Sequence, residues 1–91
     1  MSDLEKARQI IDDTDREMAR LFERRMDAAR QVAAYKKENG LSIVDAAREE
    51  HLVCQNAAYI LNEEYLSYYV RFLRATMEIS KDFQTQLTES N

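Results

Sequence analysis

Two cationic residues near the middle of the chain, Arg25 and Lys36, have a spacing that suits the binding of an anion. They are eleven residues apart, which is three turns of an α-helix, so their side chains would share one helical face to within ~20°. Arg25 also falls on the apolar side of that helix, where a cation is costly unless an anion meets it. Both side chains are long enough to converge on one ligand. The spacing therefore predicts a site for a small anion.

Polar residues with helical spacing also occur in two later segments. Asp45, Arg48 and Glu49 stand at positions i, i+3 and i+4. Ser80 and Gln84 form an i, i+4 pair, so each set would share one helical face. Taken singly, each set has an ordinary alternative as a helix cap, a surface ion pair or solvated side chains. Their joint occurrence on faces that should be core favours a shared polar site.

A long first helix must carry the two cations. Residues at alternating spacings of three and four predict an amphipathic helix over about 3–38, which Asn39-Gly40 would end. The stripe comprises Leu4, Ala7, Ile11, Thr14, Met18, Leu21, Arg25, Ala28, Val32 and Tyr35. Most of these residues are apolar, and no helix breaker interrupts them. We therefore expect one continuous helix.

Two shorter helices complete the expected fold. One is predicted over about 45–58, with Ser42 and Asp45 as competing N-caps. Another is predicted over about 63–87, capped by Asn62, with a buried side that includes Leu66, Tyr69, Val70, Leu73, Met77 and Phe83. The chain has one Gly and no Pro, which nearly excludes an all-β fold with its many turns. We predict an all-α fold of three helices in a single domain, residues 1–91.

Composition excludes several functional classes. With 45% hydrophobic and 33% charged residues the chain is expected to form a core, and no apolar run is long enough for a membrane span. The acidic N-terminus lacks an apolar export signal, so we expect a cytoplasmic protein. The net charge of −4 argues against a nucleic-acid partner. The single His and single Cys have no metal-ligand spacing, and Cys54 is expected to be a small buried residue.

The length of the first helix predicts the assembly. About 36 residues at 1.5 Å each give ~54 Å, whereas a compact globule of this chain length has a radius of gyration of only ~12 Å. The helix would therefore project beyond a single-chain globule and leave its apolar stripe in water. We expect an intertwined homodimer in which the long helices cover each other, the ordinary alternative being an antiparallel coiled coil without a site.

The spacing of the cations resembles that of the all-helical (AroQ-type) chorismate mutases. The long helix of that family carries an Arg, a second Arg seventeen residues later and a Lys eleven residues after that. Here these positions are Arg8, Arg25 and Lys36, within the stretches A-R-Q-I-I-D-D-T-D and E-R-R-M-D-A-A-R-Q-V-A-A-Y-K.

The resemblance extends over nearly the whole chain. The second helix of the family opens with D-x-x-R-E, which is present here as Asp45-Ala-Ala-Arg48-Glu49. Its third helix carries a Ser and, four residues on, a Gln or Glu, as at Ser80 and Gln84. One such pair alone would be a weak signal. Eight positions at the family's spacing are a specific one.

The resemblance implies an isomerase of the shikimate pathway that converts chorismate to prephenate for aromatic amino acid biosynthesis. The reaction is an intramolecular Claisen rearrangement that needs no metal, cofactor or covalent intermediate. By analogy, Arg8 and Arg25 would bind the two carboxylates of the dianionic substrate, and Lys36 and Gln84 would donate to its ether oxygen. Glu49 would accept a hydrogen bond from the ring hydroxyl.

The remaining residues of the expected site would support this constellation. Arg48 is expected to stay close to Glu49 and the ligand, and Asp45 and Ser80 would complete the polar wall. Arg8 lies seventeen residues from Arg25, or ~25 Å along one helix, so the two cannot reach the same small ligand within one chain. Arg8 would therefore serve the site of the partner chain.

Two other functions are compatible with the sequence. The related isochorismate-pyruvate lyases share the fold and much of the basic constellation, but that branch tends to be apolar at the position of Glu49. A non-catalytic helical dimerisation module is the other alternative, and in such a module Arg25 and Lys36 would have no ligand to bind.

Overall fold

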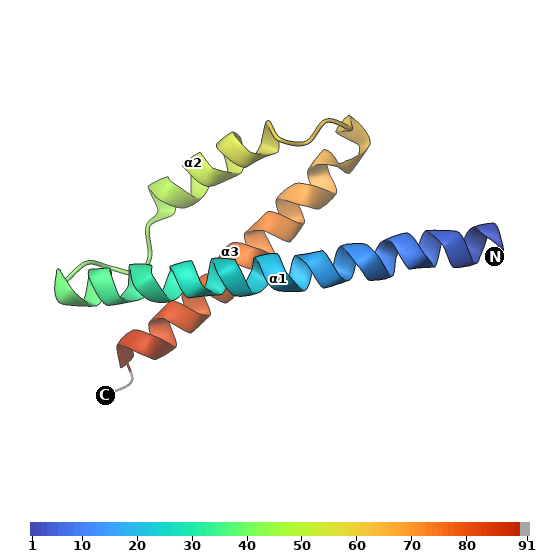
Figure 1. Cartoon of the computed structure of the whole chain (residues 1–91). Coiled ribbons are helices and arrows are strands. Elements are labelled where there is room, and N and C mark those ends of the chain that lie inside the picture. Colours follow the sequence, from blue (N-terminus) through green and yellow to red (C-terminus); the bar gives the residue numbers. More distant parts are fainter. Residues whose placement is uncertain (90–91) are drawn as a thin grey trace.

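The fold consists of three α-helices and one short 3₁₀ helix, in a computed structural model that describes residues 1–89 (Figure 1). In chain order these are α1 (Asp3–Glu38), α2 (Ala46–Ala57), the 3₁₀ helix η1 (Glu63–Tyr65) and α3 (Leu66–Glu89). No strand occurs in this part of the chain, which confirms the predicted all-α class. The segment expected to be one helix from about residue 63 begins instead with the 3₁₀ turn.

Local hydrogen bonds define both ends of α1. Ser2 caps the N-terminus, where its Oγ accepts from the Glu5 backbone N–H at 3.1 Å. The Glu5 carboxylate in turn accepts from the Ser2 backbone N–H, which completes a capping box. At the other end Gly40 adopts φ of 63°, a left-handed conformation that is cheap only for glycine. Leu41 N–H then donates to the Lys36 carbonyl at 2.8 Å, which closes a Schellman motif. The predicted stop at Asn39-Gly40 is therefore confirmed, and it places Lys36 in the last turn.

Side-chain caps also begin the two later helical segments. Of the two expected caps for α2, Asp45 is the one used, because its Oδ1 accepts from the Arg48 backbone N–H at 3.0 Å. Ser42 instead accepts from the Val44 N–H within the preceding loop, at 3.2 Å. Asn62 caps η1 by accepting from the Glu64 N–H at 3.0 Å.

The helices pack around α3. This helix crosses α1 over the C-terminal half of α1 and lies against α2, while the backbones of α1 and α2 stay apart (Figure 1). The buried core is small and consists of Ala29 and Ala33 of α1 with Leu73 and Met77 of α3. The two alanines allow the helix backbones to approach closely. Because α2 buries none of its residues in the single chain, Cys54 is exposed and the expectation that it is buried is wrong.

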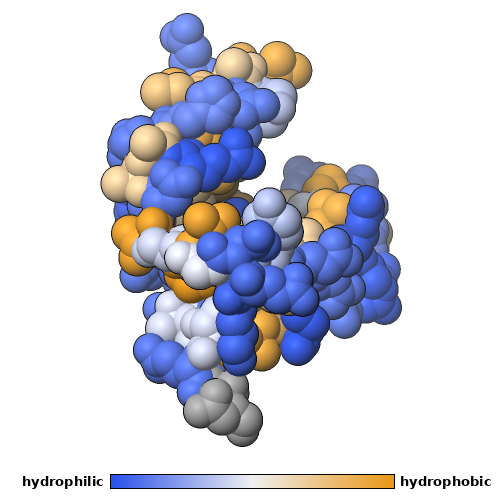
Figure 2. Space-filling model, turned by 90° about the vertical axis from the view of Figure 1, so that its left-hand side faces the viewer, coloured by the Kyte–Doolittle hydropathy of each residue, from blue (hydrophilic) through white to orange (hydrophobic). Residues whose placement is uncertain are grey.

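Most of the apolar stripe of α1 is exposed in the single chain. Residues 1–24 are exposed throughout, among them Ile11 and Met18 of the expected stripe. The chain measures 55 × 27 × 14 Å, and its radius of gyration of 16.5 Å exceeds the ~12 Å of a compact globule. Figure 2 accordingly shows apolar side chains at the surface between hydrophilic ones. Within residues 1–89 no helix has both the length and the apolar run that a membrane span needs.

Candidate active site

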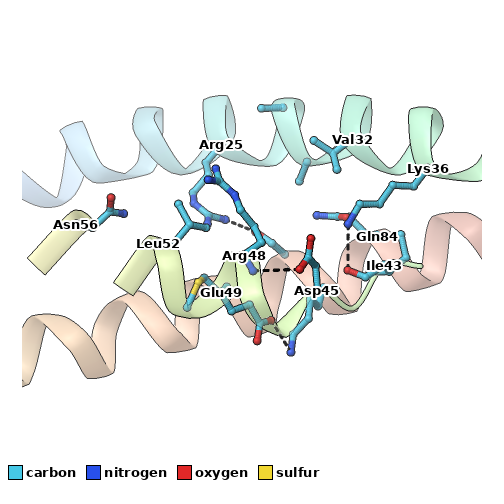
Figure 3. A pocket seen from close by; sticks show the side chains of 15 residues that line it. Arg25, Val32, Lys36, Ile43, Asp45, Arg48, Glu49, Leu52, Asn56 and Gln84 are labelled. Atoms are coloured by element: carbon cyan, nitrogen blue, oxygen red, sulfur yellow. Dashed lines mark hydrogen bonds and ion pairs between the residues drawn. The ribbon is translucent and has the colours of Figure 1, made fainter. Parts of the chain in front are cut away.

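The three helices line an open pocket of about 410 Å³ (Figure 3). It lies where α2 rests on α3 but stands away from α1, so that α1 and α2 form facing walls. Seven of the eight residues that the sequence singles out line it: Arg25, Lys36, Asp45, Arg48, Glu49, Ser80 and Gln84. Val32, Ile43, Leu52 and Met77 add apolar surface. The fold thus brings together polar groups that are as many as 59 residues apart in the sequence.

The two cations of α1 are held from the neighbouring segments. The Arg25 Nη1 donates to Ser80 Oγ, and Ser80 is itself a buried residue of α3. Lys36 Nζ donates to the Ile43 carbonyl at 3.2 Å. Both side chains point from α1 toward α2 (Figure 3), and the chain partly buries both. Arg25, which has a place on the expected apolar stripe, is therefore met by a hydroxyl rather than by apolar side chains alone.

Gln84 approaches Lys36 from the opposite helix. Its amide and the Lys36 ammonium point toward one another across the end of the pocket (Figure 3). Gln84 belongs to the same side of α3 as Ser80, as the i, i+4 spacing predicts. Two hydrogen-bond donors, one charged and one neutral, thus face a common space from two helices.

On the α2 side of the pocket, the partner of Glu49 is not the expected Arg48. Arg48 and Glu49 both line the pocket, but the partner of the Glu49 carboxylate is Lys81, at 2.9 Å from Glu49 Oε1. Arg48 and Glu49 are successive residues and leave the helix about 100° apart, and their side chains form no ion pair with each other. The Arg48 guanidinium has no hydrogen bond or ion pair with the rest of residues 1–89.

Lys81 is the charged pocket residue that sequence reasoning missed. It stands between Ser80 and Gln84 on α3 and also contacts Glu78 Oε2, at 3.0 Å. The hydrogen bonds to Glu49 and then to Glu78 raise the pKa of Lys81 above its ordinary value, so it is charged at neutral pH. The i, i+3 spacing of Glu78 and Lys81 indicates a local pair. Nothing in the sequence indicates the contact with Glu49, 32 residues earlier.

Arg8 is the one residue singled out by the sequence that the single chain does not bring to the pocket. It is exposed near the N-terminal end of α1, ~25 Å along that helix from Arg25. As long as α1 is one uninterrupted helix, its rise keeps Arg8 at this distance from Arg25.

The charges of the lining favour an anionic ligand. Four of the lining residues are cationic and two are carboxylates, a formal sum of +2, although the whole chain carries −4. A cleft with charge of one sign attracts ligands of the other. Among residues 1–89 no group of three or more His, Cys, Asp or Glu side chains is placed to hold a metal ion.

The fold and the pocket define a small helical protein with a pocket between three helices whose lining carries a formal charge of +2. A family model described as chorismate mutase type II matches residues 7–85, and the chain belongs to this family. The resemblance inferred from the spacing of the polar residues is thereby confirmed. Comparisons with curated proteins and with solved structures give no significant match.

Proposed function

We propose that this protein is a chorismate mutase that converts chorismate to prephenate in the biosynthesis of Phe and Tyr. The observation that carries the proposal is the convergence of Arg25, Lys36 and Gln84 on one pocket of about 410 Å³. The pocket has room for a ring with two carboxylates, and its formal charge of opposite sign suits a dianion. The family supports the same reaction class.

The reaction requires from the protein a pocket of the right shape and charges in the right places. One C–O bond breaks while one C–C bond forms within the same molecule, and no proton is transferred. The transition state is a compact chair-like conformer in which negative charge develops at the ether oxygen. A pocket that selects this conformer and places donors at that oxygen lowers the barrier through orientation and electrostatic stabilisation.

The donors of the pocket divide into those for the carboxylates and those for the ether oxygen. Arg25, anchored by Ser80, is suited to hold one carboxylate with its remaining N–H groups. Lys36 and Gln84 face the same space and would donate to the ether oxygen, where the full charge of Lys36 contributes most. Arg48 on the opposite wall has no ion pair within residues 1–89 and can turn to the ligand.

The carboxylates of α2 have separate roles. Glu49 lines the pocket and would accept a hydrogen bond from the ring hydroxyl. Asp45 caps α2, and through the Arg48 backbone N–H it fixes where the helix begins. It therefore contributes to the polar wall chiefly by holding α2 in place.

A homodimer would supply the missing cation and cover the exposed stripe. Two α1 helices packed antiparallel would bury residues such as Ile11 and Met18, which are 55% and 41% exposed in the single chain. The same arrangement would carry Arg8 of the partner chain to the pocket. We propose two composite sites in each dimer, each completed by the other chain.

The dimer predicts a mass of about twice 10.7 kDa in solution. Sedimentation equilibrium measures this mass directly. Replacing Ile11 with Glu would place charges in the shared apolar interface and is expected to shift the species toward the monomer and to remove activity. Glu17→Gln is a suitable control because it changes a charge of the same helix outside the stripe. A wild-type protein that stays monomeric at all concentrations would contradict the composite site.

The proposed reaction is tested by following two substrates. We expect the purified protein to consume chorismate and to form prephenate, and to release no pyruvate from isochorismate. Pyruvate from isochorismate without prephenate from chorismate would instead identify the related lyase. If neither substrate reacts, and if Arg25→Leu leaves the stability of the protein unchanged or improves it, the chain is a helical dimerisation module. Stability would not fall in that case, because a partly buried cation without a ligand is costly.

A further inference from the structure

Lys81 links α3 to α2 through Glu49, and both residues belong to the lining of the pocket. Its Nζ lies 2.9 Å from Glu49 Oε1 on α2 and 3.0 Å from Glu78 Oε2 on its own helix. The side chains of Lys81 and Glu49 are 26% and 27% exposed, whereas that of Glu78 is 64% exposed. The contact with Glu49 is therefore the shielded one, while Glu78 supports the ammonium from the solvent side.

Glu49 poses an electrostatic difficulty for the binding of a dianion. A carboxylate close to a dianion repels it, and apolar walls such as Ile43 and Leu52 limit the screening of that repulsion by water. The Lys81 ammonium, in contact with Glu49, offsets the negative charge of that carboxylate next to where the substrate would bind. Without Lys81 the formal charge of the pocket lining would fall from +2 to +1.

The contact with Lys81 leaves Glu49 able to act on a ligand. A carboxylate has two oxygens with about four acceptor positions. Lys81 approaches Oε1, so acceptor positions are left for a ligand hydroxyl. The side chain that offsets the charge of Glu49 can therefore also orient its carboxylate.

We propose that Lys81 is a positioning residue of this pocket, which fixes the Glu49 carboxylate and offsets its charge so that a dianion with a hydroxyl group can bind beside it. The inference rests on the proposed function, because it concerns the same substrate. It adds that this chain recognises the hydroxyl of the substrate through an ion pair between two helices rather than through a lone carboxylate.

The chain contains a matched control for the structural part of this role. Arg74 of α3 also forms an ion pair with α2, at 3.2 Å from Glu50 Oε1. Arg74 and Glu50 do not line the pocket. If Lys81 only fastened α2 to α3, loss of either cation would have the same kind of effect.

Steady-state kinetics with chorismate separate the two roles. Lys81→Met is expected to raise KM on the order of tenfold, with a smaller change in kcat, because an unpaired carboxylate then faces the dianion. Lys81→Arg should keep KM near the wild-type value, since it preserves the charge. Arg74→Met should leave KM within about twofold of wild type. If Lys81→Met does not fold, Lys81→Gln removes the same charge and replaces it in the comparison.

A double-mutant cycle tests whether Lys81 acts through Glu49. In a Glu49→Gln background the further change Lys81→Met should alter KM by less than about twofold, because no unpaired carboxylate is created. An equal KM effect of Lys81→Met in both backgrounds, or an effect no larger than that of Arg74→Met, would overturn the inference while the proposed reaction stands. A wild-type protein that does not turn over chorismate would overturn both.

Discussion

Lys36→Met is expected to lower kcat for chorismate by about 10²–10³. The substitution keeps an unbranched side chain of nearly the same length but removes the charge from the position that faces Gln84 across the pocket. Charge develops at the ether oxygen mainly in the transition state, so KM should change less than kcat. Because the Schellman motif at Gly40 fixes the end of α1 through the backbone, the fold should tolerate the change. Steady-state kinetics with a thermal unfolding curve measure both quantities.

Lys37→Met is the matched control for this experiment. Lys37 is adjacent, lies in the same last turn of α1 and is exposed outside the pocket. We expect its kcat to stay within about twofold of wild type. A comparable loss in the two variants would show that charge at the end of α1, rather than a contact within the pocket, is responsible. A Lys36→Met protein that retains most of its activity would contradict the role assigned to Lys36.

An equimolar mixture of Arg8→Ala and Lys36→Ala protein is expected to recover about one quarter of wild-type activity after subunit exchange, although each parent is nearly inactive. Half of the dimers would then be mixed. In each of them one site would combine the intact Lys36 of one chain with the intact Arg8 of the other. The second site of the same dimer would lack both. Activity measured before and after exchange gives the recovered fraction.

A second mixture shows whether recovery requires sites shared between chains. Arg25 and Lys36 line the same pocket of one chain, so a mixed dimer of Arg25→Ala with Lys36→Ala contains no complete site. This mixture should stay inactive. If exchange is verified by mass and the mixture with Arg8→Ala also stays inactive, the composite site is wrong. Recovery in both mixtures would instead indicate that the variants stabilise each other without sharing a site.

The helices of this protein are predictable because their determinants are local. The stop of α1 depends on one glycine in a left-handed conformation, and the start of α2 depends on Asp45 accepting from the third residue along. Both interactions involve neighbours in the sequence and can be read from residue type. The sequence does not predict the 3₁₀ turn at η1, because an Asn before the first turn indicates the start of a helical segment without distinguishing a 3₁₀ turn from an α-helix.

The choice of buried residues within α1 is less predictable. The spacing of large apolar residues predicts a stripe through Ile11, Met18 and Val32. The single chain buries Ala29 and Ala33 instead, because α3 crosses α1 at an angle and covers only its C-terminal half. Val32 also belongs to that half, but it lines the open pocket and stays exposed. Which part of an amphipathic helix is covered by its own chain depends on the crossing of a helix about 40 residues later, which local periodicity does not determine.

The sequence by itself determined which polar residues share a helical face, since 3.6 residues per turn places Arg25 with Lys36 and Ser80 with Gln84 whatever the helices pack against. It also identified the family, through the spacing of those residues along nearly the whole chain. Only the tertiary structure decided how the faces meet. The pairing of Glu49 with Lys81 depends on the register of α2 on α3, and the anchoring of Arg25 by Ser80 depends on where α1 crosses α3. Contacts between helices are set by packing over many residues at once, and no short spacing in the sequence encodes them.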